Sequence, residues 1–153
     1  MSGGRSRARA AARLAAVQAL YQHDMEGTLL APLLDEFHRH RLGGLIDDEV
    51  DDSQYVDAEV KFFDDVVKGA IARRDEIDDL IASKLADSWK IERLDKTMLQ
   101  ILRAGSYEIL ARPDVSTGTA ISEYVDVAHA FFEAREAKFV NGVLDAVAKA
   151  VRS

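Results

Sequence analysis

The sequence predicts an all-α protein, a single-domain bundle of about seven helices in two small helical subdomains that pack together. Apolar residues recur at spacings of three and four through almost all of the 153 residues. No segment alternates with the period of two that a half-buried strand requires. The length suits one domain with one sizeable core, and because the chain has no cysteine it can form no disulfide framework.

Three helices are predicted in the amino-terminal half, over about residues 7–25, 30–40 and 55–73. In the second helix Pro32 falls in the first turn, where its missing N–H would have no intrahelical partner. Gly43 and Gly44 then end that helix. Five acidic residues between positions 47 and 52 repel one another, so we expect an acidic loop at about 43–54. This run lacks the ligand spacing of an EF-hand, and a solvated loop is favoured over a calcium site.

Four further helices are predicted over about residues 75–88, 94–112, 119–133 and the final segment. The helix at 94–112 carries the most regular apolar stripe and should be central, and Pro113 should end it by disfavouring helical geometry at Arg112. Thr119 is the predicted cap of the next helix. Asn141-Gly142 is typical of a turn, but apolar residues step by fours through it, which favours a helix. Because glycine costs about 1 kcal/mol there relative to alanine, we expect another helix or a ligand close to Gly142.

The charges are unevenly distributed. Before the first acidic residue, Asp24, the chain has four arginines, whereas its net charge is −7. We therefore expect a mobile basic arm at about residues 1–8. Such arms bind phosphates because each neutralised phosphate releases counterions. Since arginine and alanine also favour helices, an ordinary solvated helix stays open as the alternative.

Few signs of catalysis are present. The sequence contains no phosphate-binding loop, dinucleotide fingerprint or zincin motif. His38 and His40 would point to different sides of a helix, so we expect surface histidines and no metal site. We expect no enzyme activity and no cofactor. Because the lack of cysteine permits a reducing compartment, we expect a cytoplasmic protein. No stretch approaches about 18 apolar residues, so we expect no membrane-spanning segment.

Two strings of residues are distinctive, Ala16-Val17-Gln18-Ala19-Leu20-Tyr21 near the start and Lys138-Phe139-Val140-Asn141-Gly142-Val143-Leu144-Asp145 near the end. Between them come Leu94-Asp95-Lys96, Ile101-Leu102-Arg103, Tyr107-Glu108-Ile109-Leu110 and Ala120-Ile121-Ser122-Glu123-Tyr124-Val125. In the order and spacing of these strings, the chain resembles the NusB family over nearly its whole length.

This resemblance implies a single RNA-binding domain over residues 1–153 and a transcription antitermination factor that is not an enzyme. Its RNA would be the single-stranded boxA element of nascent ribosomal transcripts. Its protein partner would be NusE, a ribosomal protein, within an antitermination complex on RNA polymerase. Some members of the family self-associate, so a homodimer is open. A protein–protein adaptor that uses its basic arm on an acidic partner, without RNA, is the alternative function.

Single-stranded RNA is bound by stacking on flat side chains, by hydrogen bonds to bases and by cations along the backbone. The candidate RNA-binding residues supply all three: Arg5, Arg7, Arg9, Arg13, Tyr21, Lys138, Phe139 and Asn141. We place the NusE surface around Glu92, Asp95 and Lys96. For Tyr21 and Phe139 the alternative is core packing, for Asn141 a surface amide with no partner, and for the three NusE residues a solvated face. Arg13 lies on the shoulder of an apolar stripe and has a structural alternative, pairing with a buried acid such as Glu108 or Glu123.

Overall fold

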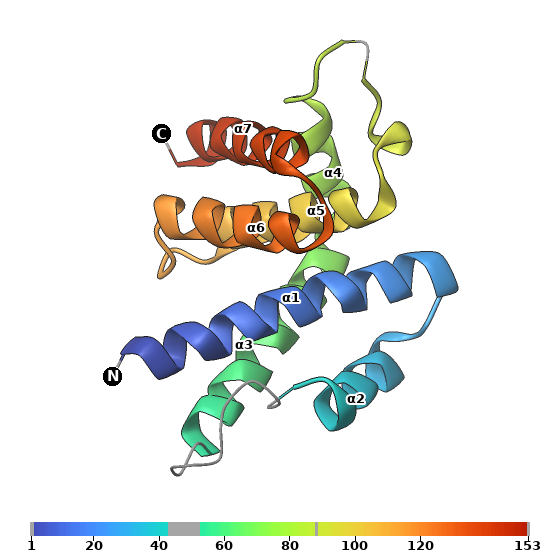
Figure 1. Ribbon diagram of the computed structural model, residues 1–153. Coiled ribbons are helices and arrows are strands. Elements are labelled where there is room, and N and C mark those ends of the chain that lie inside the picture. Colours follow the sequence, from blue (N-terminus) through green and yellow to red (C-terminus); the bar gives the residue numbers. More distant parts are fainter. Residues whose placement is uncertain (1, 43–52, 88, 153) are drawn as a thin grey trace. The chain divides into compact units, whose positions relative to one another are not determined.

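The computed structural model describes residues 2–42, 53–87 and 89–152. These residues form seven α-helices and one short 3-10 turn and contain no strand, which confirms the all-α prediction (Figure 1). The elements are α1 (Ser2–Glu26), α2 (Leu30–His40), α3 (Ser53–Ala72), α4 (Arg74–Ala82), η1 (Ile91–Arg93), α5 (Lys96–Ala111), α6 (Thr117–Phe131) and α7 (Ala134–Val151). The acidic run at 47–52 lies outside the described residues.

The chain divides into two compact units, as the prediction of two subdomains requires. The first unit is Met1–Lys68 and the second is Gly69–Ser153. The boundary falls within α3, near the carboxyl end of that helix.

In the first unit, α1 begins at Ser2 rather than near Arg7. The residues expected to form a mobile arm therefore continue the helix. Local physics accounts for this, since arginine and alanine are good helix formers and Ala8, one turn before Ala12 on the same face, is fully buried. The helix ends as expected, because Gly27 adopts φ 73° and its N–H donates to the His23 carbonyl over 3.0 Å.

Helices α2 and α3 meet through aromatic side chains. The rings of Phe37 and Phe63 are stacked with centroids 5.5 Å apart. His38 packs its edge on Phe63, and its Nε2 lies 2.6 Å from Oδ1 of Asp64. The expectation of two surface histidines is thus wrong for half-buried His38 and right for exposed His40. The cause is a carboxylate on α3, which no pattern within α2 could reveal.

In the second unit α5 is central, as predicted. Helices α4, α6 and α7 all pack against it, and every residue from Met98 to Ile109 is buried. The burial includes polar groups that have partners on neighbouring helices. Arg103 donates to both carboxylate oxygens of Asp78 over 2.8 and 2.7 Å, and the Tyr124 hydroxyl donates to Glu108. Such pairing is the condition under which charged groups are tolerated in a core.

Two glycines let helices approach α5 closely. A Cβ on Gly69, near the end of α3, would lie 2.2 Å from ring atoms of Tyr107. A Cβ on Gly105 would lie 2.9 Å from Cδ1 of Leu144 on α7. Both distances are shorter than packing allows, so a side chain at either position would force its neighbours to move.

Two boundaries in this unit differ from the prediction. Helix α4 ends at Ala82 instead of Ser88, where the Ser83 hydroxyl donates to the Leu80 carbonyl over 2.7 Å. The cap of α6 is Ser116 rather than Thr119, because the Ser116 Oγ accepts from the Thr119 N–H over 3.1 Å.

At the start of α4, Arg73 donates two hydrogen bonds to Glu76, and the bond from that guanidinium lowers the pKa of the Glu76 carboxyl.

The side chain of Arg152 fastens the end of α7 to the turn between α5 and α6. Pro113 ends α5 as expected, with Arg112 outside helical geometry, and because proline has no N–H the Ile109 carbonyl lacks its intrahelical partner. Arg152 donates to that carbonyl and to four further acceptors at 2.8–3.3 Å; the acceptors are the carbonyls of Glu108, Ile109, Arg112 and Val115 and the hydroxyl of Thr117. The guanidinium of Arg152 therefore donates to five acceptors, which lie at the end of α5, in the loop that follows it and at the first residue of α6.

Candidate functional site

The second unit contains an open pocket of about 550 Å³ between the segment that leads into α5 and the first turns of α7. Its floor is mostly apolar and its rim is charged. The lining residues are Trp89, Arg93, Leu94, Asp95, Met98, Arg135, Glu136 and Phe139. A pocket of this size and character suits a flat apolar group held at its edges by polar contacts.

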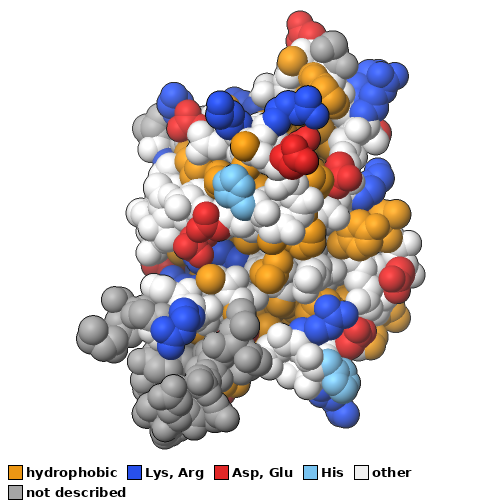
Figure 2. Space-filling model, in the orientation of Figure 1, with side chains coloured by type: hydrophobic (Ala, Val, Ile, Leu, Met, Phe, Trp, Pro, Cys, Tyr) orange, Lys and Arg blue, Asp and Glu red, His pale blue; other side chains and the backbone are white. Residues whose placement is uncertain are grey.

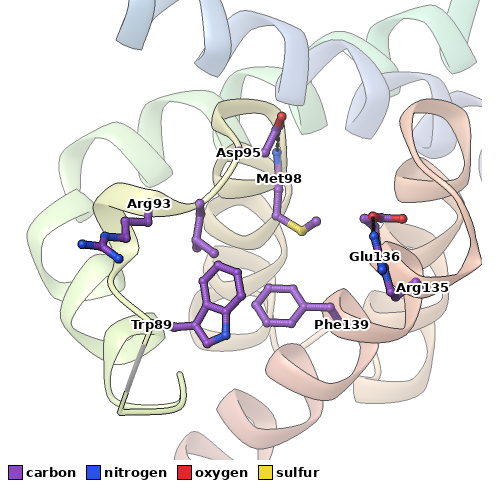
Figure 3. A pocket seen from close by; sticks show the side chains of 8 residues that line it. Trp89, Arg93, Asp95, Met98, Arg135, Glu136 and Phe139 are labelled. Atoms are coloured by element: carbon purple, nitrogen blue, oxygen red, sulfur yellow. Dashed lines mark hydrogen bonds and ion pairs between the residues drawn. The ribbon is translucent and has the colours of Figure 1, made fainter.

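Two aromatic rings dominate the pocket (Figure 3). The centroids of Trp89 and Phe139 are 6.4 Å apart, with their planes inclined at 45°. The indole is 51% exposed although it is a large apolar group. In Figure 3 the Met98 side chain extends toward the two rings, whereas the Arg93 guanidinium is directed away from them. The site therefore offers exposed ring surface together with nearby cations.

Local structure fixes the positions of these side chains. The N–H of Trp89 donates to the Ala86 carbonyl over 2.8 Å, in the turn after α4. Asp95 is the N-cap of α5, and its Oδ1 accepts from the N–H groups of Thr97 and Met98 over 2.8 and 3.1 Å. This cap sets where α5 begins and so places Met98 in the pocket wall.

The rim carries balanced charge, with two arginines and two acidic residues. Arg135 extends into solvent and has a long contact of 3.4 Å with Glu136, while one oxygen of Asp95 is engaged in capping. On the face of the molecule shown in Figure 2, Lys and Arg side chains likewise lie beside Asp and Glu side chains at several places. The main feature of this pocket is therefore its aromatic ring surface, because the positive and negative charges of its rim offset one another.

The predicted residues of α7 fall on and beside the pocket. Phe139 is half-buried and lines it, whereas Lys138 and Asn141 are exposed on the helix. The predicted helix through Asn141-Gly142 is confirmed. Of the two neighbours expected at Gly142, another helix is wrong, because a Cβ built there would meet nothing within 4 Å beyond the adjacent residues and backbone of its own helix, while a ligand stays a prediction.

The residues expected to meet a protein partner are at the same end of α5. Glu92, Asp95 and Lys96 are all exposed, in η1 and at the start of the helix. Asp95 also lines the pocket with Phe139. One pocket thus combines a residue expected to bind RNA with one expected to bind a protein.

The predicted residues of the first unit lie on α1. Arg5 and Arg7 are exposed, and Tyr21 is 38% exposed, so its ring is accessible despite its place on an apolar stripe. Arg9 is half-buried, with its guanidinium 4.6 Å from the ring centroid of Phe62 on α3. Arg13 is only 3% exposed and its guanidinium lies 4.9 Å from the centroid of the same ring, so its side chain is buried, while its expected pairing with Glu108 or Glu123 stays a prediction.

The different burial of these arginines gives a prediction. Replacing buried Arg13 with alanine should lower the melting temperature, because the guanidinium stacks on Phe62 and its stem fills space beneath the helix. Replacing exposed Arg7 with alanine should lower RNA affinity and leave the melting temperature unchanged. Thermal unfolding and RNA titration of both variants test this, and equal melting temperatures for the two would contradict the structural role of Arg13.

Six pocket residues were missed from the sequence: Trp89, Arg93, Leu94, Met98, Arg135 and Glu136. One signal was present, because Trp89 lies in a polar segment outside the apolar stripes, where a large aromatic residue has no predicted core to enter. The others had no such signal. Leu94 and Met98 belong to the apolar stripe of the helix predicted at 94–112, and the two arginines and Glu136 are unremarkable until α5 and α7 are brought together.

Other kinds of site are absent from the part of the chain that the structure describes. No three His, Asp or Glu side chains there are grouped so as to hold a metal ion. No helix in the same residues is long and apolar enough to cross a membrane. An all-helical fold with a partly exposed aromatic pocket in one unit and an arginine-bearing helix in the other is typical of proteins that bind other molecules.

Comparison with known proteins identifies its family. The NusB family matches residues 10–149, and the chain belongs to this family. Transcription antitermination protein NusB of Novosphingobium aromaticivorans is 70% identical over 146 residues, which cover 95% of this chain and 96% of that relative. The protein of the same name from Sphingopyxis alaskensis is 60% identical over 148 residues, covering 97% of each. A solved structure of antitermination factors NusB and NusE in complex with dsRNA is similar with a TM-score of 0.73 and 28% identity, covering 94% of this chain and 98% of that chain.

Proposed function

We propose that this chain is a transcription antitermination factor that binds the single-stranded boxA element of nascent ribosomal transcripts. It acts together with NusE, as part of an antitermination complex on RNA polymerase, and it is a regulator rather than an enzyme. Support comes from the family, from the name of its relatives, and from the likeness to a solved complex that contains NusB, NusE and RNA.

The observation that carries the RNA assignment is the pair of rings in the pocket, half-exposed Trp89 and half-buried Phe139. Single-stranded RNA is held largely by stacking of splayed bases on aromatic side chains, and each stacked base contributes about 1–3 kcal/mol. Trp89 and Phe139 offer such ring faces, and exposed Lys138 and Asn141 add a cation and an amide on the same helix. On the first unit, exposed Arg5 and Arg7 would contact phosphates and Tyr21 would offer another ring.

The protein partner is assigned to the exposed turn before α5. Glu92, Asp95 and Lys96 present charges of both signs there, which suits a polar protein interface better than a polyanion. We place NusE on this turn, beside the pocket.

A protein–protein adaptor without RNA is the second candidate, and the balanced charge of the pocket rim favours it. An apolar floor with two cations and two anions would also accept a segment of a protein. Capture of partners from a nuclease-treated lysate separates the two functions, since the partners of an adaptor would survive removal of RNA.

The RNA function predicts a steep dependence of affinity on salt. If about four phosphates are engaged, the logarithm of the association constant should fall with a slope near −3 against the logarithm of salt concentration, because about 0.7 counterions are released per phosphate of a single strand. Titration of a labelled boxA RNA and a scrambled RNA, with and without NusE and at two or more salt concentrations, measures this. Undetectable binding of both RNAs in the presence of NusE would refute the proposed function.

A further inference from the structure

Gly142 occupies a position where nothing within the chain requires glycine. It is the ninth of the 18 residues of α7 and is exposed. Its φ is not positive, since Gly27 has the only positive φ among the described residues. A Cβ at Gly142 would meet no atom within 4 Å. Because alanine stabilises a helix interior relative to glycine, neither backbone conformation nor internal packing explains this residue.

The surroundings of Gly142 on the helix are partly polar. Residues three and four apart share a face, so Lys138, Phe139, Asp145 and Ala146 surround Gly142, and Asn141 precedes it in sequence. Lys138 and Asn141 are exposed, and Asp145 is paired with Lys149 over 3.1 Å. The face therefore presents a cation, an amide and a strip of helix without a side chain, and its one carboxylate is offset by a neighbouring lysine.

This chemistry matches a nucleic-acid backbone better than a protein. The core of a protein interface uses apolar and aromatic side chains and is depleted of lysine and aspartate, whereas the face around Gly142 carries Lys138 and Asp145 beside one ring, Phe139, and one small side chain, Ala146. Phosphates instead require cations and hydrogen-bond donors, which Lys138 and Asn141 supply. The pocket ring of Phe139 projects from the turn of α7 that also carries Lys138.

We propose that the sugar-phosphate backbone of bound single-stranded RNA passes directly over Gly142, which lacks a Cβ so that the strand can approach α7. Lys138 then contacts a phosphate and Asn141 donates to the same stretch of RNA, while a base enters the pocket beside Phe139. This inference rests on the proposed RNA-binding function. Gly142 is thus a positioning residue, because its lack of a side chain determines how closely the RNA strand can approach α7.

The test is Gly142→Ala in the full chain, probed with labelled boxA RNA. We expect RNA affinity to fall about tenfold, because a methyl group moves the backbone away from both polar contacts. We also expect the melting temperature to rise by about 1–4 °C, since alanine is the better helix former. Gly118→Ala is the matched control, because Gly118 is also helical, exposed and without neighbours within 4 Å. The control should leave RNA affinity unchanged.

Three results would overturn this inference alone, provided that the unmodified protein binds the RNA. They are unchanged RNA affinity of Gly142→Ala, a lower melting temperature of that variant, and weaker binding of NusE with unchanged binding of RNA. The last would place the protein partner on this face. Failure of the unmodified protein to bind RNA would instead refute the proposed function and this inference together.

Discussion

Replacing Arg152 with alanine should lower the free energy of unfolding by about 3 kcal/mol and the melting temperature by about 6–12 °C. The guanidinium donates to four carbonyls and one hydroxyl at the turn between α5 and α6. Truncation would remove this donor from all five acceptors; the carbonyls of Glu108 and Arg112 keep their bonds from the N–H groups of Arg112 and Val115, whereas the Ile109 carbonyl faces Pro113, which has no N–H. Thermal and urea unfolding monitored by circular dichroism measure the loss.

Lys149→Ala is the control for this prediction. Lys149 is on the same helix but is largely exposed, and its ion pair with Asp145 should contribute less than about 0.5 kcal/mol. Arg152→Lys should fall between the two variants, because a lysine has three donors and cannot reach all five acceptors. If Arg152→Ala unfolded at the same temperature as Lys149→Ala, the side chain would not be an anchor.

Replacing Trp89 with alanine should weaken binding of boxA RNA about 10- to 100-fold. The indole is the largest exposed ring in the pocket, and the loss of one stacked base corresponds to about 1–3 kcal/mol. Because about half of the side chain is exposed, folding should be little affected. Titration of labelled RNA at constant salt, with the melting temperature of the same sample, gives both quantities.

Phe131→Ala is the matched control for Trp89→Ala. Phe131 is also an exposed aromatic residue of the second unit, at 42%, and it does not line the pocket. RNA affinity of this variant should equal that of the unmodified protein. Equal affinity of the Trp89 and Phe131 variants would show that RNA does not stack in the pocket, and the adaptor function would then be favoured.

Much of the fold could be predicted because helix formation depends on the types and spacing of residues that are close together in the sequence. The spacing of apolar residues placed all seven helices in order, identified α5 as central, and correctly favoured a helix over a turn at Asn141-Gly142. Pro113 ended α5 through its effect on the residue before it. These features depend on residues within a few positions of one another.

The rest depends on contacts between distant segments. Arg152 binds carbonyls about forty residues earlier in the sequence, and Asp78 is the partner of Arg103, 25 positions away. The pocket exists only because the segment after α4 meets α7, so Trp89 and Arg135 carried no periodic signal. Arg13 shows the intermediate case, where its angular position predicted burial and the identity of its aromatic neighbour, Phe62, could not be foreseen.

The position of Trp89 also supplies an optical probe. The chain contains a single tryptophan, and its half-exposed indole borders the pocket. Light at the long-wavelength edge of the aromatic absorption excites tryptophan and leaves tyrosine largely unexcited, so the emission of the unlabelled protein comes from this one place. A nucleobase stacked on the indole quenches that emission, whereas an apolar side chain of a protein shifts it to shorter wavelength. The change in emission that follows the addition of each partner therefore distinguishes a nucleobase in the pocket from a protein side chain.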